Sequence, residues 1–262
     1  MAKNKTVETR RPLIAGNWKM NNTISESMRL VNNLTGKVKA AKDRDIVVCA
    51  PATALAVVTT ALKGKNIQVG AQNVHWEKSG AYTGEISAPM LTELGVKYAI
   101  VGHSERRQYF GETCATVNAR AKAALFANIT PIICVGESLE KREKGSYKLV
   151  ITGQVKRAMA DIKKSDAAKC VIAYEPVWAI GTGKTATFEQ AEEVCAHIRG
   201  VLTRLYDAKT ANAVRILYGG SVKPDTIDGL MVKPNVDGAL VGGAALKSDD
   251  FARIVNFVTP AE

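Results

Sequence analysis

Three side chains in this sequence have the chemistry needed to move a proton to or from a carbon atom. Lys19, His103 and Glu175 each follow a short apolar run, and Asn17 lies two positions before Lys19. A carboxylate can remove a proton, while an ammonium group and an imidazole can stabilise the negative charge that develops. If the fold brings these groups together, they form a candidate acid–base site.

Each candidate also has a structural interpretation. Lys19 could be a surface lysine, His103 a hydrogen-bonded structural histidine, and Glu175 one half of a salt bridge. Asn17 and Lys19 share one parity of a strand, which predicts that both side chains point to the same side. Pro176 restricts Glu175 to an extended backbone and so fixes the direction of its side chain.

The residues after His103 predict a short helix that begins at Ser104. The N–H groups at the start of a helix disfavour a positive charge nearby. We therefore expect His103 to act as a neutral imidazole, which can donate a hydrogen bond without first losing a proton.

Two glycine pairs and one long loop complete the candidate site. Gly219-Gly220-Ser221 and Gly242-Gly243-Ala244 each follow an apolar run, and glycines allow a phosphate to approach backbone N–H groups closely. An apolar segment with a glycine-rich centre follows Glu175, and an exposed segment of this kind needs something to cover. We predict that it is a lid. The segment reads Pro176-Val177-Trp178-Ala179-Ile180-Gly181-Thr182-Gly183-Lys184-Thr185-Ala186.

Eight short apolar runs separated by amphipathic segments must position these residues. The runs are nearly continuous rather than alternating, which is typical of parallel strands covered on both faces. Two of the intervening segments, Ser25–Ala40 and Thr187–Leu205, have apolar residues at helical spacing, and Thr187 with Gln190 predicts a capping box. The predicted strands are Leu13–Gly16, Ile46–Ala50, Ile67–Ala71, Tyr98–Gly102, Thr130–Val135, Val171–Tyr174, Val214–Tyr218 and Gly238–Val241.

This order predicts an α/β fold, a single-domain (β/α)8 TIM barrel, with a doubly wound open sheet as the alternative. In a TIM barrel the active site lies at the carboxyl ends of the strands. The candidate residues all follow predicted strands, so the fold would gather them at one end.

The composition limits the other classes of function. The chain has 262 residues, 46% of them hydrophobic, and a net charge of +11. The charge leaves a nucleic-acid-binding or surface-adhesion role open, although acidic residues are interspersed with the basic ones. The five cysteines have no metal-ligand spacing, no apolar run is long enough to span a membrane, and no dinucleotide motif follows a strand. We expect a cytoplasmic protein with free thiols, no metal and no cofactor.

Several motifs together resemble the triosephosphate isomerase family, from Pro12 to the end of the chain. The matching stretches begin with Gly16-Asn17-Trp18-Lys19-Met20-Asn21, Gly70-Ala71-Gln72-Asn73, Gly80-Ala81-Tyr82-Thr83-Gly84-Glu85 and Val101-Gly102-His103-Ser104-Glu105-Arg106-Arg107. They continue with Cys134-Val135-Gly136-Glu137, Ala173 to Gly183, Tyr218-Gly219-Gly220-Ser221-Val222 and Val241-Gly242-Gly243-Ala244.

The resemblance implies an isomerase of glycolysis and gluconeogenesis that interconverts dihydroxyacetone phosphate and D-glyceraldehyde 3-phosphate through an enediolate. Glu175 would be the base and His103 the neutral electrophile. Lys19 would supply positive charge, and Asn17 would help to position the substrate. The phosphate-binding groups implied by the family are Gly181, Ser221, Gly242 and Gly243.

The resemblance also implies a homodimer. The connection between Asn73 and Glu85 is long and carries aromatic residues, which by itself suggests burial against another subunit. In the family, the loop around Thr83 inserts near the partner's Asn17 and Met20. Arg106 and Glu85 are then candidates for an ion pair at that interface.

Two features depart from the family pattern, and two rival functions remain. Residues 1–11 form an N-terminal extension, which we expect to be disordered, before a catalytic domain of residues 12–262. Ala245 stands where the family usually has Ser, which puts the polar network around the phosphate in doubt. The rival enzymes are an aldolase, which would need a Schiff-base lysine inside the barrel, and a tryptophan-pathway isomerase.

Overall fold

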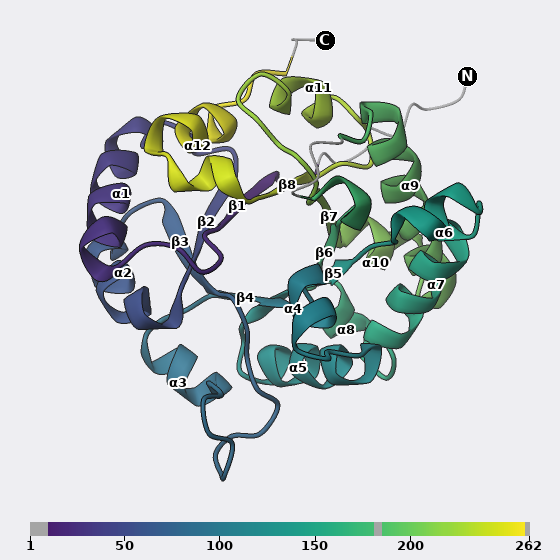
Figure 1. Ribbon diagram of the computed structural model, residues 1–262, viewed down its shortest axis with the longest axis horizontal. Helices are drawn as coiled ribbons and strands as arrows, with labels where there is room; N and C mark the ends of the chain where they lie inside the picture. Colours follow the sequence, from purple (N-terminus) through teal and green to yellow (C-terminus); the bar gives the residue numbers. More distant parts are fainter. Residues whose placement is uncertain (1–9, 181–184, 260–262) are drawn as a thin grey trace.

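A closed barrel of eight parallel strands forms the centre of the molecule (Figure 1). The computed structural model describes residues 10–180 and 185–259. Each strand pairs in parallel with its neighbours in sequence, and β8 closes the ring against β1. The strands are β1 (Leu13–Asn17), β2 (Asp45–Ala50), β3 (Ile67–Ala71), β4 (Tyr98–Val101), β5 (Thr130–Val135), β6 (Val171–Tyr174), β7 (Arg215–Tyr218) and β8 (Gly238–Val241).

The predicted barrel is confirmed, and the open sheet is excluded by the β1–β8 pairing. All eight predicted strands are present, with ends shifted by one residue at most. The fourth strand ends at Val101, one residue before the predicted end, because Gly102 turns the chain with a φ of +69°. That turn directs the next residue, His103, over the mouth of the barrel.

Helices surround the barrel and cover the outer face of every strand (Figure 1). The predicted helices after β1 and before β7 are confirmed as Ile24–Lys37 and Phe188–Leu205, and the capping box of Thr187 and Gln190 is present. The described helices are α1 (Ile24–Lys37), α2 (Leu55–Leu62), α3 (Ala88–Glu93), α4 (Ser104–Tyr109), α5 (Cys114–Phe126), α6 (Leu139–Glu143), α7 (Tyr147–Ala158), α8 (Lys164–Ala167), α9 (Phe188–Leu205), α10 (Ala208–Ala213), α11 (Ile227–Met231) and α12 (Ser248–Val255). Short 3₁₀ turns lie at Ala52–Ala54, Val177–Ala179 and Gly243–Leu246.

Two buried layers hold the barrel together. Side chains that alternate inward along the strands, such as Ala15, Ile100 and Leu217, fill its interior. Their neighbours in sequence point outward and pack against the helices in a larger apolar cluster. Since both faces of each strand are buried, the nearly continuous apolar runs of the sequence are explained.

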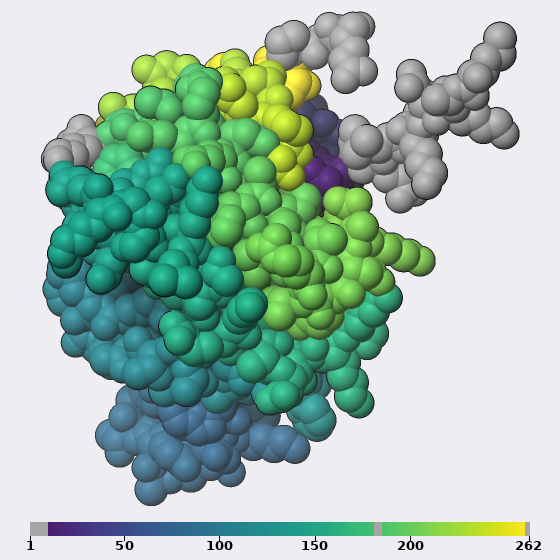
Figure 2. Space-filling view, turned by 90° about the vertical axis from the view of Figure 1, so that its right-hand side faces the viewer, coloured from purple at the N-terminus to yellow at the C-terminus, as the bar shows by residue number. Residues whose placement is uncertain are grey.

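The ends of the described chain and one long loop lie outside this regular pattern. Arg10 and Arg11, the last residues of the predicted disordered extension, form ion pairs with Asp237 and Asp45, so the predicted disorder does not include them. Residues 1–9 lie outside the described residues. The chain between β3 and α3 projects from the barrel at the lower edge of both views (Figures 1 and 2). No described helix is long and apolar enough to cross a membrane.

Candidate active site

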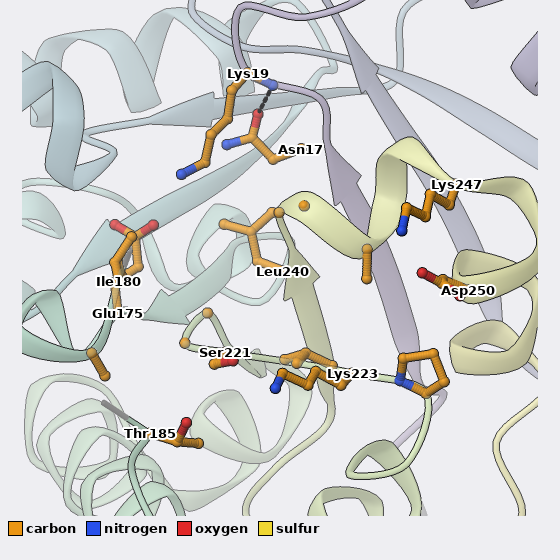
Figure 3. A pocket seen from close by; sticks show the side chains of 18 of the residues that line it. Asn17, Lys19, Glu175, Ile180, Thr185, Ser221, Lys223, Leu240, Lys247 and Asp250 are labelled. Carbon is orange, nitrogen blue, oxygen red and sulfur yellow. Dashed lines mark hydrogen bonds between the residues drawn. The ribbon is translucent and has the colours of Figure 1, made fainter. Parts of the chain in front are cut away.

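A cavity of about 810 Å³ opens at the carboxyl ends of the strands and gathers most of the predicted site residues (Figure 3). Its volume lies within the range of about 300–1,000 Å³ that is common for small-molecule sites. The predicted residues that line it are Asn17, Lys19, His103, Glu175, Ser221, Gly242 and Gly243. Gly181 lies outside the described residues.

The Glu175 carboxylate is buried at the inner end of this cavity, where β6 ends. One oxygen lies 2.9 Å from His103 Nε2, and the other accepts a hydrogen bond of 2.9 Å from the Ser104 N–H. Burial raises the pKa of Glu175, but His103, the Ser104 N–H and Lys19 together lower it by more. The pKa of this carboxyl therefore lies below its ordinary value, and the group is an ionised base at neutral pH.

His103 caps the amino end of α4, as the sequence predicts. Its Nδ1 accepts a hydrogen bond of 3.3 Å from the Glu105 N–H, which leaves Nε2 as the N–H donor toward Glu175. Burial has the largest single effect and lowers the pKa of His103, but the Glu175 and Glu105 carboxylates together raise it by more. The carboxylates thus oppose burial and the amino end of α4, which both favour the neutral imidazole that the sequence predicts.

Lys19 reaches the cavity through a backbone turn rather than through strand alternation. β1 ends at Asn17, and Lys19 has a left-handed φ of +52°. Lys19 therefore faces the cavity as predicted, but this turn, and not strand alternation, directs it there. The Lys19 N–H donates to Asn17 Oδ1 over 2.9 Å, and Gln72 Nε2 donates to the Lys19 carbonyl over 2.8 Å. Its ammonium pairs with Glu105 over 2.6 Å, and Figure 3 shows it on the same side of the cavity as Glu175.

The two glycine loops line the cavity next to the candidate catalytic residues: a Cβ atom on Gly242 would lie 3.6 Å from Lys19 Cε, and one on Gly219 would lie 3.0 Å from Glu175 Cγ. Gly242 precedes the 3₁₀ turn Gly243–Leu246, and the first N–H groups of such a turn have no partner within it. A Cβ atom added to Gly243 would meet nothing within 4 Å, so the backbone there faces open space. This arrangement can bind an anion. Ala245 lies beneath the loop at 1% exposure and does not line the cavity, so its methyl group faces the core rather than a ligand.

The described ends of the predicted lid border the same cavity. Ala179, Ile180 and Thr185 line it, while residues 181–184 lie outside the described residues. Trp178 Nε1 donates to the buried Glu137 carboxylate over 2.9 Å, and burial raises the pKa of Glu137. The first part of the segment is therefore anchored to the end of β5.

Sequence reasoning missed several residues that hold or line the site. Ser104 and Glu105 contact Glu175 and Lys19, and Gln72 supports the Lys19 turn. Lys223 and Lys247 line the outer part of the cavity. The position of Ser104 at the start of a helix was a usable signal for its N–H, whereas nothing local in the sequence indicates the contacts of Gln72.

The predicted interface residues lie beside the active site. Met20, Glu85 and Arg106 line a second cavity of about 310 Å³ that also contacts Asn17, Lys19 and His103. Within one chain Arg106 pairs with Glu112, and Glu85 pairs with Arg120 over 3.0 Å. Thr83 is exposed on the projecting loop and does not line this cavity.

No cluster of metal-binding side chains occurs among residues 10–180 and 185–259. The described residues of the site offer a carboxylate, an imidazole, an ammonium group and backbone N–H donors. These groups can remove a proton, stabilise an oxyanion and bind an anionic substituent.

Comparisons with known proteins agree with this geometry. A family model described as triosephosphate isomerase matches residues 12–258. Proteins named triosephosphate isomerase from Clostridium acetobutylicum and Clostridium novyi are 57% and 55% identical to this chain over 248 residues. The matches cover 95% of this chain and 100% and 99% of those proteins. The crystal structure of triosephosphate isomerase from Bartonella henselae superposes with a TM-score of 0.86 at 40% identity, covering 94% of this chain and 98% of that one.

Proposed function

Because this chain belongs to the triosephosphate isomerase family, an isomerase family, we propose that it interconverts dihydroxyacetone phosphate and D-glyceraldehyde 3-phosphate. The observation that carries the proposal is the convergence of Glu175, His103 and Lys19 in one cavity that two glycine loops also line. A triose phosphate needs a base and oxyanion donors at one end and anion-binding groups at the other.

The reaction is a proton transfer between adjacent carbons. Glu175 takes a proton from the carbon next to the substrate carbonyl, and the electron pair moves onto the carbonyl oxygen to give an enediolate. His103 Nε2–H and the Lys19 ammonium donate to the two oxygens, and Asn17 helps to position them. Return of the proton to the neighbouring carbon, with redistribution of the hydroxyl proton, completes the isomerisation.

Substrate binding changes which protonation state of His103 is favoured. In the ligand-free site the Glu175 carboxylate favours the imidazolium. When the carboxylate turns to the substrate carbon, burial and the amino end of α4 remain, and both favour the neutral imidazole. The hydrogen bond from Glu105 to Nδ1 then keeps the single proton on Nε2.

The rate enhancement typical of enzymes requires more than a catalytic base. A positioned base contributes about 10²–10⁴-fold, whereas enzymes usually accelerate reactions by about 10⁶-fold or more. Removal of one preorganised oxyanion donor costs about 3–4 kcal/mol in other enzymes. Lys19 and His103 therefore carry a share of catalysis comparable to that of Glu175.

The phosphate group supplies binding energy away from the reacting carbons. Ser221, Gly242 and Gly243 would bind it, together with Gly181, and this energy drives residues 176–186 over the site. Such closure excludes water and keeps the enediolate from losing its phosphate. The positions of Ala179, Ile180 and Thr185 on the cavity wall support this role.

Membership of the family also supports a proposal for the pathway, the location and the assembly of the enzyme. We place the enzyme in glycolysis and gluconeogenesis, in the cytoplasm, as a homodimer without a cofactor, with residues 12–262 as the catalytic unit. The five free cysteines fit a reducing compartment. The projecting loop and the cavity beside Met20 fit a subunit contact at the active site.

A coupled assay of glyceraldehyde 3-phosphate conversion tests the proposal. Wild-type protein should turn over rapidly, and Glu175→Gln should lose about 10³-fold or more in kcat while its thermal unfolding stays cooperative, because the amide is not a base. Glu93→Gln, which removes a charge at the far end of the barrel, is the matched control and should behave like the wild type. A folded wild-type protein without activity would refute the proposed function.

A further inference from the structure

The guanidinium group of Arg107 joins the ends of two strands directly beneath the catalytic groups. Its Nε donates to the Gly102 carbonyl over 2.8 Å, and Nη2 donates to the Cys134 carbonyl over 3.1 Å. Gly102 directly follows β4 and precedes His103, while Cys134 is the last but one residue of β5. A planar guanidinium can hold two carbonyls at a fixed separation, which a flexible ammonium cannot do.

The two carbonyls belong to the chain segments that form hydrogen bonds with Glu175. On the β4 side, His103 and Ser104 contact the two oxygens of the Glu175 carboxylate. On the β5 side, the Glu175 N–H donates to the carbonyl of Val135 over 2.8 Å, one residue after Cys134. Arg107 therefore links the donors of the carboxylate to the strand that holds the Glu175 backbone.

The absence of a side chain at Gly102 leaves room for the guanidinium. A Cβ atom on Gly102 would lie 2.9 Å from Arg107 Nη2 and 2.6 Å from Val117. Behind Glu175, a cavity of about 310 Å³ borders Arg107, Ser104 and Gly136. The β4–β5 ladder ends at the pair Val101 and Ile133. One residue further along each chain, the hydrogen bonds of Arg107 add a link between Gly102 and Cys134.

We propose that Arg107 is a positioning residue for the isomerisation: its guanidinium fixes the Gly102 carbonyl against the end of β5, beyond the last ladder pair, and so fixes where His103 and Ser104 meet the Glu175 carboxylate. The inference rests on the proposed function, since it assigns a role to Arg107 in that reaction. A displacement of about 1 Å between reacting groups can cost about 100-fold in rate. Arg107 itself does not line the large cavity.

Replacement of the guanidinium tests this role. We expect Arg107→Ala to lower kcat about 100-fold with little change in KM. The isotope effect with carbon-deuterated substrate should rise, since proton transfer becomes slower than the other steps. Free guanidinium at up to about 20 mM, far below the molar concentrations that unfold proteins, can enter the cavity behind Glu175 and should restore activity about tenfold in a saturable way. Sodium or ammonium chloride at the same ionic strength should not.

Arg44→Ala is the matched control. Arg44 also donates to two backbone carbonyls, those of Val255 and Phe257, but at the opposite end of the barrel. Its loss should lower thermal stability without changing kcat, the isotope effect or the response to guanidinium. If Arg107→Ala fails to fold, Arg107→Lys takes its place, since a lysine can still contact one of the two carbonyls and should show an intermediate kcat.

The outcomes separate the two proposals. A folded Arg107→Ala enzyme with wild-type kcat, or one whose loss of activity only follows its melting temperature and is not rescued by guanidinium, overturns the positioning role. Inactive wild-type protein would instead refute the proposed function, and the role of Arg107 in that reaction with it.

Discussion

The Glu175 carboxylate remains ionised in a place where burial alone would favour the protonated acid. His103 is the strongest of the groups that oppose burial, followed by the Ser104 N–H and Lys19. Because the folded-state pKa is lowered, the ionised group stabilises the fold above its unfolded pKa. This contribution is lost as the pH falls through the folded pKa. At the scale of the residue, the neighbouring groups thus keep the base ionised.

Removal of the imidazole should reverse the balance at Glu175. In His103→Gln, burial becomes the dominant influence, and we expect the pKa of Glu175 to rise through its ordinary value of 4.5. The carboxyl should then titrate at a higher pH than it does in the wild type. A ¹³C NMR titration of labelled glutamate carboxyls measures this directly, with the Glu175→Gln spectrum as the assignment.

His197→Gln is the control for that titration. His197 bonds to Thr152 and to the Lys148 carbonyl on the outside of the barrel, so its loss should leave the titration of Glu175 unchanged. An unchanged or lower pKa of Glu175 in His103→Gln would show that His103 does not hold the charge.

At the scale of the element, the ends of β5 and β6 approach each other more closely than side chains allow. A Cβ atom on Gly136, directly after β5, would lie 1.9 Å from the carbonyl oxygen of Glu175. The φ of Gly136 is not in the left-handed region, so the glycine is required by space rather than by conformation. The close approach places the backbone of the base against the strand that Arg107 also contacts.

Gly136→Ala should therefore displace the backbone of Glu175, the proposed base. We expect the end of β6 to move away, with a loss of kcat of about 100-fold and of about 2–3 kcal/mol in the free energy of unfolding. Coupled assays and urea denaturation measure the two effects. Gly36→Ala in α1 is the matched control, since its new methyl group meets nothing within 4 Å. This control should be neutral or slightly more stable. Wild-type activity in Gly136→Ala would contradict the requirement for close approach.

At the scale of the whole molecule, apolar side chains are exposed around the projecting loop and the second cavity. Met20 is 97% exposed and Phe110 is 67% exposed, and both line that cavity beside Lys19 and His103. Exposed apolar groups concentrated in one region are typical of interaction sites. They support the proposed dimer, in which each subunit's loop would cover its partner's active-site rim.

A charge placed at Met20 should separate the subunits. We expect the wild-type protein to sediment at twice the chain mass of 28.1 kDa and Met20→Glu to raise the dissociation constant at least about tenfold, because a carboxylate would be buried at the contact. Met90→Glu on α3, where the side chain is 54% exposed, is the control and should remain dimeric. A wild-type monomer at micromolar concentration in sedimentation equilibrium would contradict the proposed dimer.

The sequence by itself determined the barrel and the end of it that carries the site. Eight apolar runs with helical segments between them leave few topologies, and polar residues after those runs must meet at the carboxyl ends of the strands. This is why Lys19, His103 and Glu175 could be grouped before any coordinates, and why the Thr187 cap could be placed from local spacing. Local sequence patterns are sufficient to predict features that depend only on residues close together in the chain.

Only the tertiary structure decided how the grouped residues act on one another. The sequence indicated a neutral His103 from its helix alone, but only the structure shows the burial that lowers its pKa and the Glu175 carboxylate 2.9 Å away that raises it. Strand parity could not reveal the left-handed turn at Lys19, or that Gln72, more than fifty residues away, supports it. Charges and hydrogen bonds depend on distances between segments far apart in the chain, and those distances exist only once the barrel has closed.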